Sequence, residues 1–491
     1  MNKMTDTLPE LKNYIADQFS TPEIERDGFV CNANTDEALQ RQLSCSTEQV
    51  EQALQASADA YEAGVWENTP SRERAEVLDA IAQELSKTHY IEAISRADAL
   101  TTGAPIRTTL KMAQLAPLVF KGAAQSIRAG LLESKVPSPT VDVDYFRSPW
   151  GPSLLISPWN GPTAIGSHKI ASALAAGAPC IIKPSEWAPH SAVLMAQAIA
   201  TVGLPKGVFQ LTCGSRHIGA QMVNDSRIKA ISFTGGLNGG RAIARAAADQ
   251  FVPTQLELGG NNQLLVLQDA DLEKAAMGIA YGLSNLNGQW CRALGRVIVH
   301  EDQKQTLIKR VLDILSTLAL GHSLSDATDM GPMVNRGQYE SVLADIEKLK
   351  ALGGQVLQST ALPDLKGYFI PPTLIDGCSP DDTREEIFGP VACVHTYRTP
   401  EEALALANGT ELGLAGYVYG EDLEKATAFA KAMRTGGVKI NGYSLLSIGQ
   451  NTPRSAWGLS GLGEEGQTQS IEFFTGARVV GVSPQDPLGG R

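Results

Sequence analysis

Hydrophobic and polar residues follow two different spacings along this chain. Apolar residues recur at helical spacing over 47–64 and 70–88, which predicts two amphipathic helices, the first with Thr47 as its N-cap and its end at Gly64. From about residue 150, short uninterrupted apolar runs alternate with helical patterns. This alternation is typical of a parallel sheet covered by helices, because strands buried on both faces need no alternating polar residues.

The alternation occurs in two successive stretches, and we therefore expect two α/β units. Two further segments, 137–148 and 471–482, are rich in β-forming residues and belong to neither unit, which is common for strands that pair with another subunit. In the first unit the predicted strands lie in 151–160, 178–186, 207–214 and 228–236, and the helices in 168–177, 191–203 and 241–248. In the second unit the predicted strands lie in 263–268, 296–300, 391–397 and 416–419, and the helices in 272–284, 303–319, 337–353 and 421–434.

Composition and charge narrow the class of protein. A chain of 491 residues with 43% hydrophobic and 19% charged residues is typical of a globular protein of two or three domains. Its net charge of −12 argues against nucleic acids and anionic membranes as partners. The N-terminal segment has no apolar core of signal-peptide length, and no apolar run is long enough to span a bilayer. We therefore expect a cytoplasmic protein without a membrane partner.

Cysteine and histidine usage gives no sign of a metal site. The 7 cysteines are scattered and never form a C-x-x-C pair, which argues against both a disulfide framework and a zinc site. The 7 histidines show no H-E-x-x-H or comparable ligand pair. We expect no metal cofactor.

Polar clusters follow several predicted strands of the first unit, where an open parallel sheet binds its ligands. Four glycines within 235–240 stand between a predicted strand and a predicted helix, and bare backbone at a helix N-terminus suits a pyrophosphate. The alternative interpretation is that these glycines form only a turn. Lys183 and Glu186 follow another strand, where they could hold ribose hydroxyls or belong to a solvated loop.

Three further side chains could carry reaction chemistry. Cys291 precedes an apolar strand pattern, Glu257 lies between apolar neighbours, and Asn160 follows a strand. Each has a structural alternative: a buried thiol, a buried ion pair and a turn cap, respectively. A thiol nucleophile, a carboxylate base, an amide donor and a dinucleotide-compatible loop are together the set needed to oxidise an aldehyde through a covalent thioester.

From about residue 45 to the C-terminus, the order of motifs resembles that of the aldehyde dehydrogenase superfamily. The spacing of 34 residues between Glu257 and Cys291 also fits this family. The motifs are PWN at 158–160, KPSE at 183–186, GLPKGV at 203–208, FTG at 233–235 with Gly240, ELGG at 257–260, GQWC at 288–291, GPMV at 331–334, YFIPPTL at 368–374 and EEIFGPV at 385–391.

The resemblance implies an α/β fold of three parts and a homodimer or homotetramer. A Rossmann-like NAD-binding domain would comprise 1–130 and 149–258 and return at 440–470. An α/β catalytic domain would comprise 259–440, and a small β oligomerisation arm would comprise 131–148 and 471–491.

The resemblance also implies the catalytic roles. Cys291 would attack the aldehyde. Glu257 would first take the thiol proton through a water and would then activate a water that hydrolyses the thioester. Asn160 and the Cys291 N–H would hold the oxyanion, and Lys169 matches a lysine near the active site that relays protons in some members. CoA-acylating members typically lack the glutamate, so its presence favours release of the acid by water.

For the cofactor, the resemblance implies NAD, with NADP as the alternative. A carboxylate at Glu186 repels a 2′-phosphate and favours NAD, whereas Lys183 and Ser185 could still accommodate the phosphate. Glu386 resembles the residue that binds the nicotinamide ribose, and Phe388 the ring beside the nicotinamide. The cofactor-binding residues implied in this way are Ile156, Ser157, Trp159, Lys183, Ser185, Glu186, Gly235, Gly236, Gly240, Leu258, Gly259, Glu386 and Phe388.

Several positions depart from the family pattern. Gly236 replaces a serine that often contacts the pyrophosphate. Around the substrate, Gly161 replaces a common phenylalanine, Trp290 and Arg292 flank the nucleophile, and Arg454 lies where the pattern usually reads Pro-Phe-Gly-Gly. Our leading hypothesis is a wide pocket for a bulky apolar or aromatic aldehyde. The rival hypothesis is a semialdehyde whose carboxylate meets Arg292 or Arg454, and a non-catalytic protein with this fold is the alternative of another class.

Overall fold

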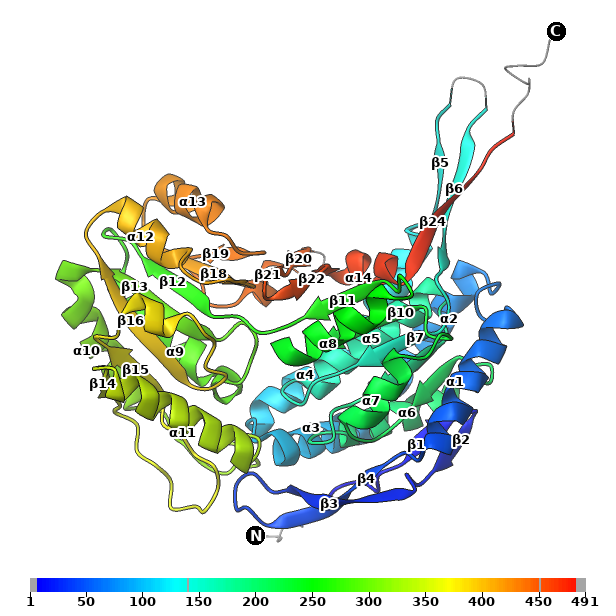
Figure 1. Ribbon diagram of the computed structural model, residues 1–491, viewed down its shortest axis with the longest axis horizontal. Coiled ribbons are helices and arrows are strands. Elements are labelled where there is room, and N and C mark those ends of the chain that lie inside the picture. The colour runs from blue at the N-terminus through cyan, green and yellow to red at the C-terminus, as the bar shows by residue number, and fades with distance from the viewer. Residues whose placement is uncertain (1–6, 139–140, 450–451, 483–491) are drawn as a thin grey trace.

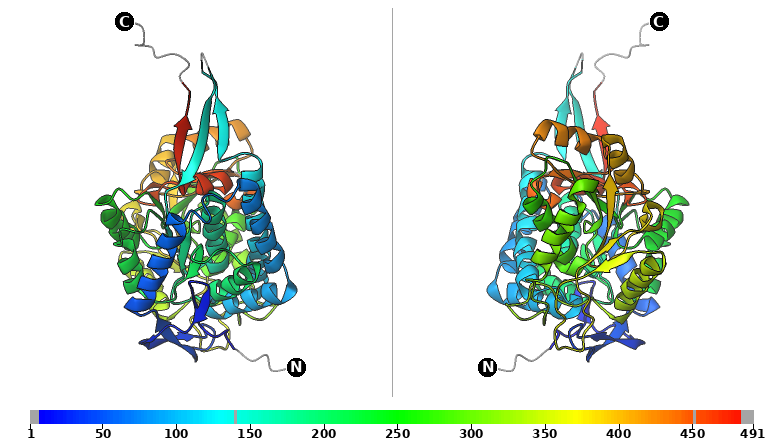
Figure 2. Two further views of the ribbon diagram at one scale, coloured as in Figure 1. Left: turned by 90° about the vertical axis from the view of Figure 1, so that its right-hand side faces the viewer. Right: turned by 90° about the vertical axis from the view of Figure 1, so that its left-hand side faces the viewer.

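The computed structural model of the protein describes residues 7–138, 141–449 and 452–482. Two large sheets with helices packed on their faces stand side by side, and a narrow three-stranded sheet projects from one of them (Figure 1, Figure 2). The chain passes from the first large sheet to the second over the short segment 258–261.

The first sheet has the strand order β2-β1-β9-β8-β7-β10-β11-β22. Its central strands β9, β8, β7, β10 and β11 run parallel, and antiparallel strands border them at both ends. The strands are β1 (Asn13–Ile15), β2 (Gln18–Ser20), β7 (Ser153–Ile156), β8 (Cys180–Lys183), β9 (Phe209–Leu211), β10 (Ala230–Thr234), β11 (Thr254–Glu257) and β22 (Gly461–Leu462).

Two hydrophobic clusters cover the opposite faces of this sheet, which is why its central strands are buried at nearly every position. The helices on one face are α2 (Ser71–Leu85), α3 (Thr88–Thr102), α4 (Ile106–Arg128), α5 (Pro162–Ala176) and α6 (His190–Val202). The helices on the other face are α1 (Thr47–Glu62), α7 (Arg216–Val223) and α8 (Leu237–Ala248).

The second sheet has the order β14-β15-β16-β13-β12-β18-β19 and is parallel except for β14. Its strands are β12 (Asn262–Val266), β13 (Leu294–His300), β14 (Gln355–Leu357), β15 (Thr373–Asp376), β16 (Val391–Tyr397), β18 (Gly416–Tyr419) and β19 (Val438–Ile440). Its helices are α9 (Leu272–Ser284), α10 (Lys304–Leu315), α11 (Arg336–Ala351), α12 (Pro400–Ala407) and α13 (Leu423–Ala432).

The projecting sheet is antiparallel and has the order β24-β6-β5. It brings β24 (Thr475–Val480), near the end of the chain, alongside β5 (Glu133–Val136) and β6 (Val143–Pro149), as Figure 1 shows. Three smaller strand pairs are the hairpin of β3 (Ile24–Cys31) and β4 (Ala38–Ser44), β17 (Leu412–Gly413) with β21 (Trp457–Gly458), and β20 (Arg454–Ser455) with β23 (Glu464–Glu465). The remaining helix is α14 (Gln467–Phe473). Short 3₁₀ turns occur at Asn285–Gly288, Glu301–Gln303, Pro380–Thr383 and Leu445–Ile448.

Two of the sequence predictions for local structure are wrong. The first helix is capped by Ser46 rather than Thr47, because the Ser46 side chain accepts the Gln49 N–H while the Gln49 side chain accepts the Ser46 N–H. The segment 471–473 is helical rather than extended, because Ile471 and Phe474 bury in the cluster beneath α4 and α5. The strand of the projecting sheet therefore begins only at Thr475.

The glycine-rich turn is also shorter than predicted. Helix α8 begins at Leu237 with Gly236 as its N-cap, so Gly239 and Gly240 lie inside its first turn rather than in a loop before residue 241. Gly240 is buried against Leu258, where the Cβ of any larger residue would collide with the leucine side chain. The absence of a side chain at Gly240 thus allows α8 to pack closely against Leu258.

We expect the Ser46→Ala substitution to destabilise α1 locally by ~1 kcal/mol, because the Gln49 N–H loses its acceptor. Hydrogen exchange of the α1 amides, followed by mass spectrometry, should then speed up by about fivefold. Thr47→Ala is the matched control and should leave this rate unchanged. Equal effects of the two substitutions would contradict the cap at Ser46.

Candidate active site

Cys291 lies in a loop that left-handed backbone and buried amide side chains hold in place. The loop follows a 3₁₀ turn in which Leu286 and Asn287 have positive φ. The Asn287 side chain donates to the carbonyls of Gly103 (2.9 Å) and Pro332 (2.8 Å). Gly288 also has a positive φ, and a Cβ there would collide with the backbone of Pro390. The shape of the loop is therefore set by three distant segments of the chain.

Asn262, the first residue of β12, ties this loop to the second sheet. Its Nδ2 donates to the carbonyls of Cys291 (2.9 Å) and Ala293 (2.6 Å), and its Oδ1 accepts the N–H of Ala415 (3.0 Å). One buried amide thus joins the nucleophile loop to β12 and to the segment before β18. Sequence reasoning did not single out Asn262.

The surroundings of Cys291 keep its thiol protonated in the free protein. Burial raises the pKa of Cys291 to about 11, and the adjacent Arg292 guanidinium opposes this effect in part. Since the thiolate is the nucleophilic form of a cysteine, an attack by this sulfur would require a base to take the proton first.

Glu257 ends β11 and is buried, with 3% of its surface exposed. Its Oε1 has no hydrogen-bond partner among the described residues. Burial first and the Glu465 carboxylate second raise the pKa of Glu257 well above its ordinary value, against the positive charges of Arg292 and Lys169. Its charge also raises the pKa of Cys291, so the two groups lie in one electrostatic environment, as a base and its nucleophile require.

Asn160 stands between β7 and α5, and its Nδ2 donates to the carbonyl of Gln289 (2.9 Å) in the nucleophile loop. An amide nitrogen carries two hydrogens, so one donor remains available. The Cys291 N–H has no hydrogen-bond acceptor within the described part of the chain. Both groups that sequence analysis assigned to an oxyanion therefore have a free N–H.

Lys169 lies in α5 and donates to the Ser232 hydroxyl at 2.6 Å. Burial lowers the pKa of Lys169 to about 8, against the attraction of the Glu465 and Glu257 carboxylates. Glu465 is a second carboxylate, partly buried with 16% of its side chain exposed, and sequence reasoning missed it because its neighbours Gly463, Glu464 and Gly466 look like a solvated turn. Burial alone raises the pKa of Glu465, yet the cations around it lower it below its ordinary value.

The four residues predicted to shape the substrate pocket have different surroundings. Trp290 is buried in a small cluster with Ala104 and Leu286 and meets the ring of Tyr281 edge to face, with 6.4 Å between centroids. Gly161 is the N-cap of α5, and a Cβ there would touch only the tip of Ile165.

Arg292 and Arg454 belong to the charged group around Glu465. Arg292 is buried, with its Nη2 4.0 Å from the Glu465 carboxylate and its carbonyl accepting the Tyr417 hydroxyl. Arg454, in β20, lies opposite Glu465 in the register of β20 and β23. The positive charges of both arginines lower the pKa of Glu257, which places both beside the reacting groups.

The parallel strands of the first sheet end together beside a cleft. In the sheet register, Ile156 lies opposite Lys183 and Thr234 opposite Glu257, so four strand ends meet at one edge. The cleft there has a volume of about 770 Å³. Its lining includes eight of the predicted cofactor residues: Ile156, Ser157, Trp159, Lys183, Ser185, Glu186, Gly235 and Gly236.

The other predicted cofactor residues lie outside the lining of this cleft. Gly240 and Leu258 are buried in the packing of α8. Glu386 accepts the Gly260 N–H at 2.8 Å, and Gly259 passes so close that a Cβ would collide with the Glu386 carboxylate. Burial raises the pKa of Glu386 to about 7. Phe388 packs edge to face on Trp159, with 5.5 Å between centroids, and so adjoins the wall of the cleft.

The cleft fits a dinucleotide in shape and chemistry. Nothing lies within 4 Å of a Cβ built at Gly236, the N-cap of α8, so a phosphate could approach the bare helix N-terminus. Glu186 lies between two cations, Lys183 Nζ at 3.6 Å and Arg26 at 3.8 Å. Arg26 comes from the β3–β4 hairpin and was not predicted from the sequence.

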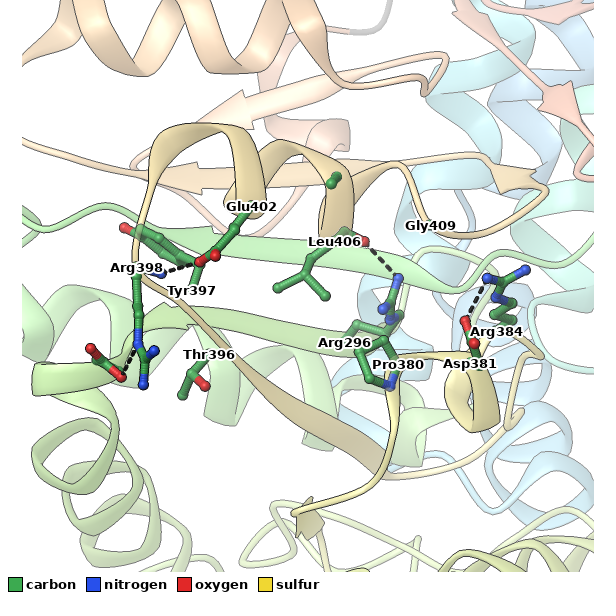
Figure 3. A pocket seen from close by; sticks show the side chains of 12 residues that line it. Arg296, Pro380, Asp381, Arg384, Thr396, Tyr397, Arg398, Glu402, Leu406 and Gly409 are labelled. Carbon is green, nitrogen blue, oxygen red and sulfur yellow. Dashed lines mark hydrogen bonds and ion pairs between the residues drawn. The ribbon is translucent and has the colours of Figure 1, made fainter.

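A separate cavity of about 500 Å³ lies over the second sheet, between α12 and the 3₁₀ turn at Pro380 (Figure 3). Arg296 donates there to the Leu406 carbonyl, and Arg398 and Arg384 pair with Glu301 and Asp381. None of the predicted site residues lines this cavity. Elsewhere in the described ranges, no group of three or more His, Cys, Asp or Glu side chains could hold a metal ion. No helix within these ranges is long and apolar enough to cross a bilayer.

A thiol that shares a buried environment with a carboxylate, next to the strand ends that border this cleft, is the arrangement expected of a cysteine-dependent oxidoreductase. The chain belongs to the aldehyde dehydrogenase family, whose model matches residues 21–480. The α/β fold predicted from the sequence, with its Rossmann-like part, catalytic part and β arm, is confirmed by solved structures of this family.

Three relatives illustrate the similarity. Aminoaldehyde dehydrogenase 1 of Malus domestica is 34% identical over 89% of both chains. The geranial dehydrogenase of Castellaniella defragrans is 31% identical over 95% of this chain and 98% of its own. The solved structure of betaine aldehyde dehydrogenase from Staphylococcus aureus in complex with NAD⁺ has a TM-score of 0.91 and 28% identity, and the match covers 99% of this chain and 97% of that one.

We expect Arg292→Gln to slow the alkylation of Cys291 by iodoacetamide at pH 8 by about three- to tenfold. The guanidinium lowers the pKa of the thiol, so its removal raises that pKa further and leaves less thiolate. Mass spectrometry of the Cys291 peptide over a pH series measures the rate, and Arg310→Gln, on the exposed face of α10, is the control. Faster alkylation of the variant would contradict this electrostatic assignment.

Proposed function

We propose that this protein oxidises an aldehyde to the carboxylic acid with NAD, with Cys291 as nucleophile and Glu257 as general base. The observation that carries the proposal is the shared buried environment of these two groups at the edge of the cleft. Neither group is committed to a structural bond, because Glu257 Oε1 lacks a partner among the described residues and the thiol is in no disulfide.

In the first half of the reaction, Glu257 takes the thiol proton through a water as the sulfur bonds to the aldehyde carbon. The Asn160 side chain and the Cys291 N–H donate to the oxygen as it gains negative charge. The bound NAD supplies the acceptor for the hydride that leaves this carbon. Cys291 is then the sulfur of a thioester.

In the second half, after Glu257 has released the thiol proton to solvent, it takes a proton from a water that attacks the thioester carbon and returns this proton to the Cys291 sulfur as the acid leaves. The nearby Lys169, whose pKa is about 8, can pass protons between Glu257 and Ser232. The presence of Glu257 supports hydrolysis over transfer to CoA, and the intact set of Cys291, Glu257 and Asn160 supports catalysis over a purely structural role.

The residues around Glu186 support NAD over NADP. A 2′-phosphate would meet the Glu186 carboxylate, although Lys183 and Arg26 are close enough to attract it. Glu386 and Phe388 would contact the nicotinamide end from the second sheet.

The substrate has two candidate chemistries. The rings of Trp290, Tyr281 and Tyr443 form an aromatic group near the nucleophile loop, which supports a bulky apolar or aromatic aldehyde, as does the name of the geranial dehydrogenase relative. Gly161 leaves room beside Asn160. The charged group around Arg292 supports the carboxylate-bearing alternative.

We also propose that 1–130 and 149–258, with a return at 440–470, form the NAD-binding domain and 259–440 the catalytic domain. The arm at 131–148 and 471–491, of which 139–140 and 483–491 lie outside the described residues, would join subunits into a homodimer or homotetramer. The exposed apolar side chains of Val136, Val479 and Val480 on the projecting sheet support this assembly, since isolated apolar strands favour pairing.

We expect Glu257→Gln to slow hydrolysis of the thioester at least about 100-fold, because no base remains to activate the water. Intact-protein mass spectrometry should then show an acyl-enzyme that wild type does not accumulate. Cys291→Ala should form neither this adduct nor NADH. Wild-type turnover by Cys291→Ala would show that the mechanism is wrong.

We expect Glu186→Gln to raise the NADP-to-NAD ratio of kcat/KM by about tenfold, because the substitution removes a negative charge beside the 2′ position and leaves Lys183 and Arg26 in place. Steady-state kinetics with both cofactors measure the ratio. Glu273→Gln, which removes an exposed carboxylate on α9, is the control. An unchanged NADP-to-NAD ratio would show that the 2′ position of the adenosine ribose does not lie beside Glu186.

A further inference from the structure

Two arginines beside the nucleophile have hydrogen-bond donors with no acceptor. Arg292 is 4% exposed, and its Nη1 has no partner among the described residues. The Nε of Arg454 is also buried without a partner in the described ranges, while its Nη1 reaches only the Thr452 carbonyl, at 3.4 Å. Unsatisfied guanidinium groups are costly to bury, so a ligand that accepts hydrogen bonds from these two would stabilise the site.

The charges around these arginines do not balance. Arg292, Arg454 and Lys169 are three cations that face two carboxylates, Glu465 and Glu257. His168 adds no positive charge at neutral pH, because burial lowers its pKa to about 4. The centre therefore has an excess of positive charge that one additional carboxylate would reduce.

Pairing with Glu465 alone does not account for both arginines. Arg292 approaches Glu465 only to 4.0 Å and directs Nη2 toward it, which leaves Nη1 for another acceptor. The carbonyl of Arg292 is held by Tyr417, so its backbone cannot turn away without loss of that hydrogen bond. The Arg292 guanidinium also lowers the pKa of Cys291, so an anion on Nη1 would lie in the electrostatic environment of this sulfur.

We propose that Arg292 and Arg454 bind a carboxylate at the far end of the substrate, so that the enzyme acts on a short ω-oxo acid, a semialdehyde. This inference rests on the proposed aldehyde oxidation and names the substrate class of that site. A carboxylate fits better than a phosphate, because it is planar, accepts from two guanidinium donors and carries the single charge that the centre lacks. The rings of Trp290 and Tyr281 would then pack against the carbon chain of the substrate, between its aldehyde and its carboxylate.

The first test is NADH formation from malonic, succinic and glutaric semialdehydes, each paired with a neutral aldehyde of the same shape, such as 4-methylpentanal for succinic semialdehyde. We expect kcat/KM for at least one acid to exceed that of its neutral partner by about 100-fold, the usual effect of a buried charge pair. A preference for the neutral partner in every pair would overturn the inference. 4-Aminobutanal, a cation, should be the poorest member of the panel.

The second test compares Arg292→Gln and Arg454→Gln with wild type. Each should lower the ratio of acid to neutral kcat/KM by about 30- to 100-fold. The ratio is the informative quantity, because any effect on the thiol pKa slows both substrates alike. Arg292→Lys should recover part of the ratio, and Arg310→Gln, on the surface of α10, should retain all of it. An unchanged ratio in both glutamine variants would overturn the inference.

A third test requires no turnover. Succinate, the product expected from succinic semialdehyde, should slow the alkylation of Cys291 in wild type more than butyrate does, and this difference should disappear in Arg454→Gln. If no aldehyde yields NADH but succinate still protects, the proposed function fails while the carboxylate site stands. If aldehydes are oxidised but succinate and butyrate protect equally, the carboxylate site fails alone.

Discussion

The hydrogen bonds of Asn262 are the interaction on which the reaction centre depends. This one side chain holds the carbonyls of Cys291 and Ala293 and the N–H of Ala415, and so joins the nucleophile loop to two strands of the second sheet. Only four residues separate Asn262 from Glu257, the last residue of β11 in the first sheet. Glu257, the proposed base, and Asn262, which supports the loop of the proposed nucleophile, are therefore placed by one short crossing between the sheets.

Burial at this crossing determines how readily Cys291 and Glu257 give up their protons. It raises the pKa of both Cys291 and Glu257, so the thiol holds its proton more firmly and Glu257 is a stronger base than an exposed carboxylate. The same low polarity strengthens each fixed charge nearby, and thus Arg292, Lys169 and Glu465 act on the reacting groups more strongly than they would in water. A charged group at the far end of a substrate would alter this balance directly, which couples substrate recognition to the protonation of the base.

Local patterns predict the repeating architecture well and its boundaries less well. Strands β7, β8, β10, β12, β13 and β16 occur where the sequence predicts them, because apolar runs buried on both faces leave a clear trace in the sequence. The N-cap at Ser46 escapes prediction because two adjacent residues can both cap a helix, and only the reciprocal bond with Gln49 distinguishes them. The apolar residues of helix α14 suit a strand equally well, and contact with α4 and α5 decides in favour of the helix.

The sequence by itself determined the types of reactive group and the order of the motifs: a thiol, a carboxylate and an amide at strand ends or in loops near them, followed by the family resemblance they carry. These follow from local composition, which a linear pattern records. Only the tertiary structure decided that Glu465, Asn262 and Arg26 join the site, because each comes from a segment that is unremarkable by itself and acts through contacts with residues far along the chain. Burial, and with it the protonation of Cys291 and Glu257, is likewise a property of the assembled sheets and of no single stretch of residues.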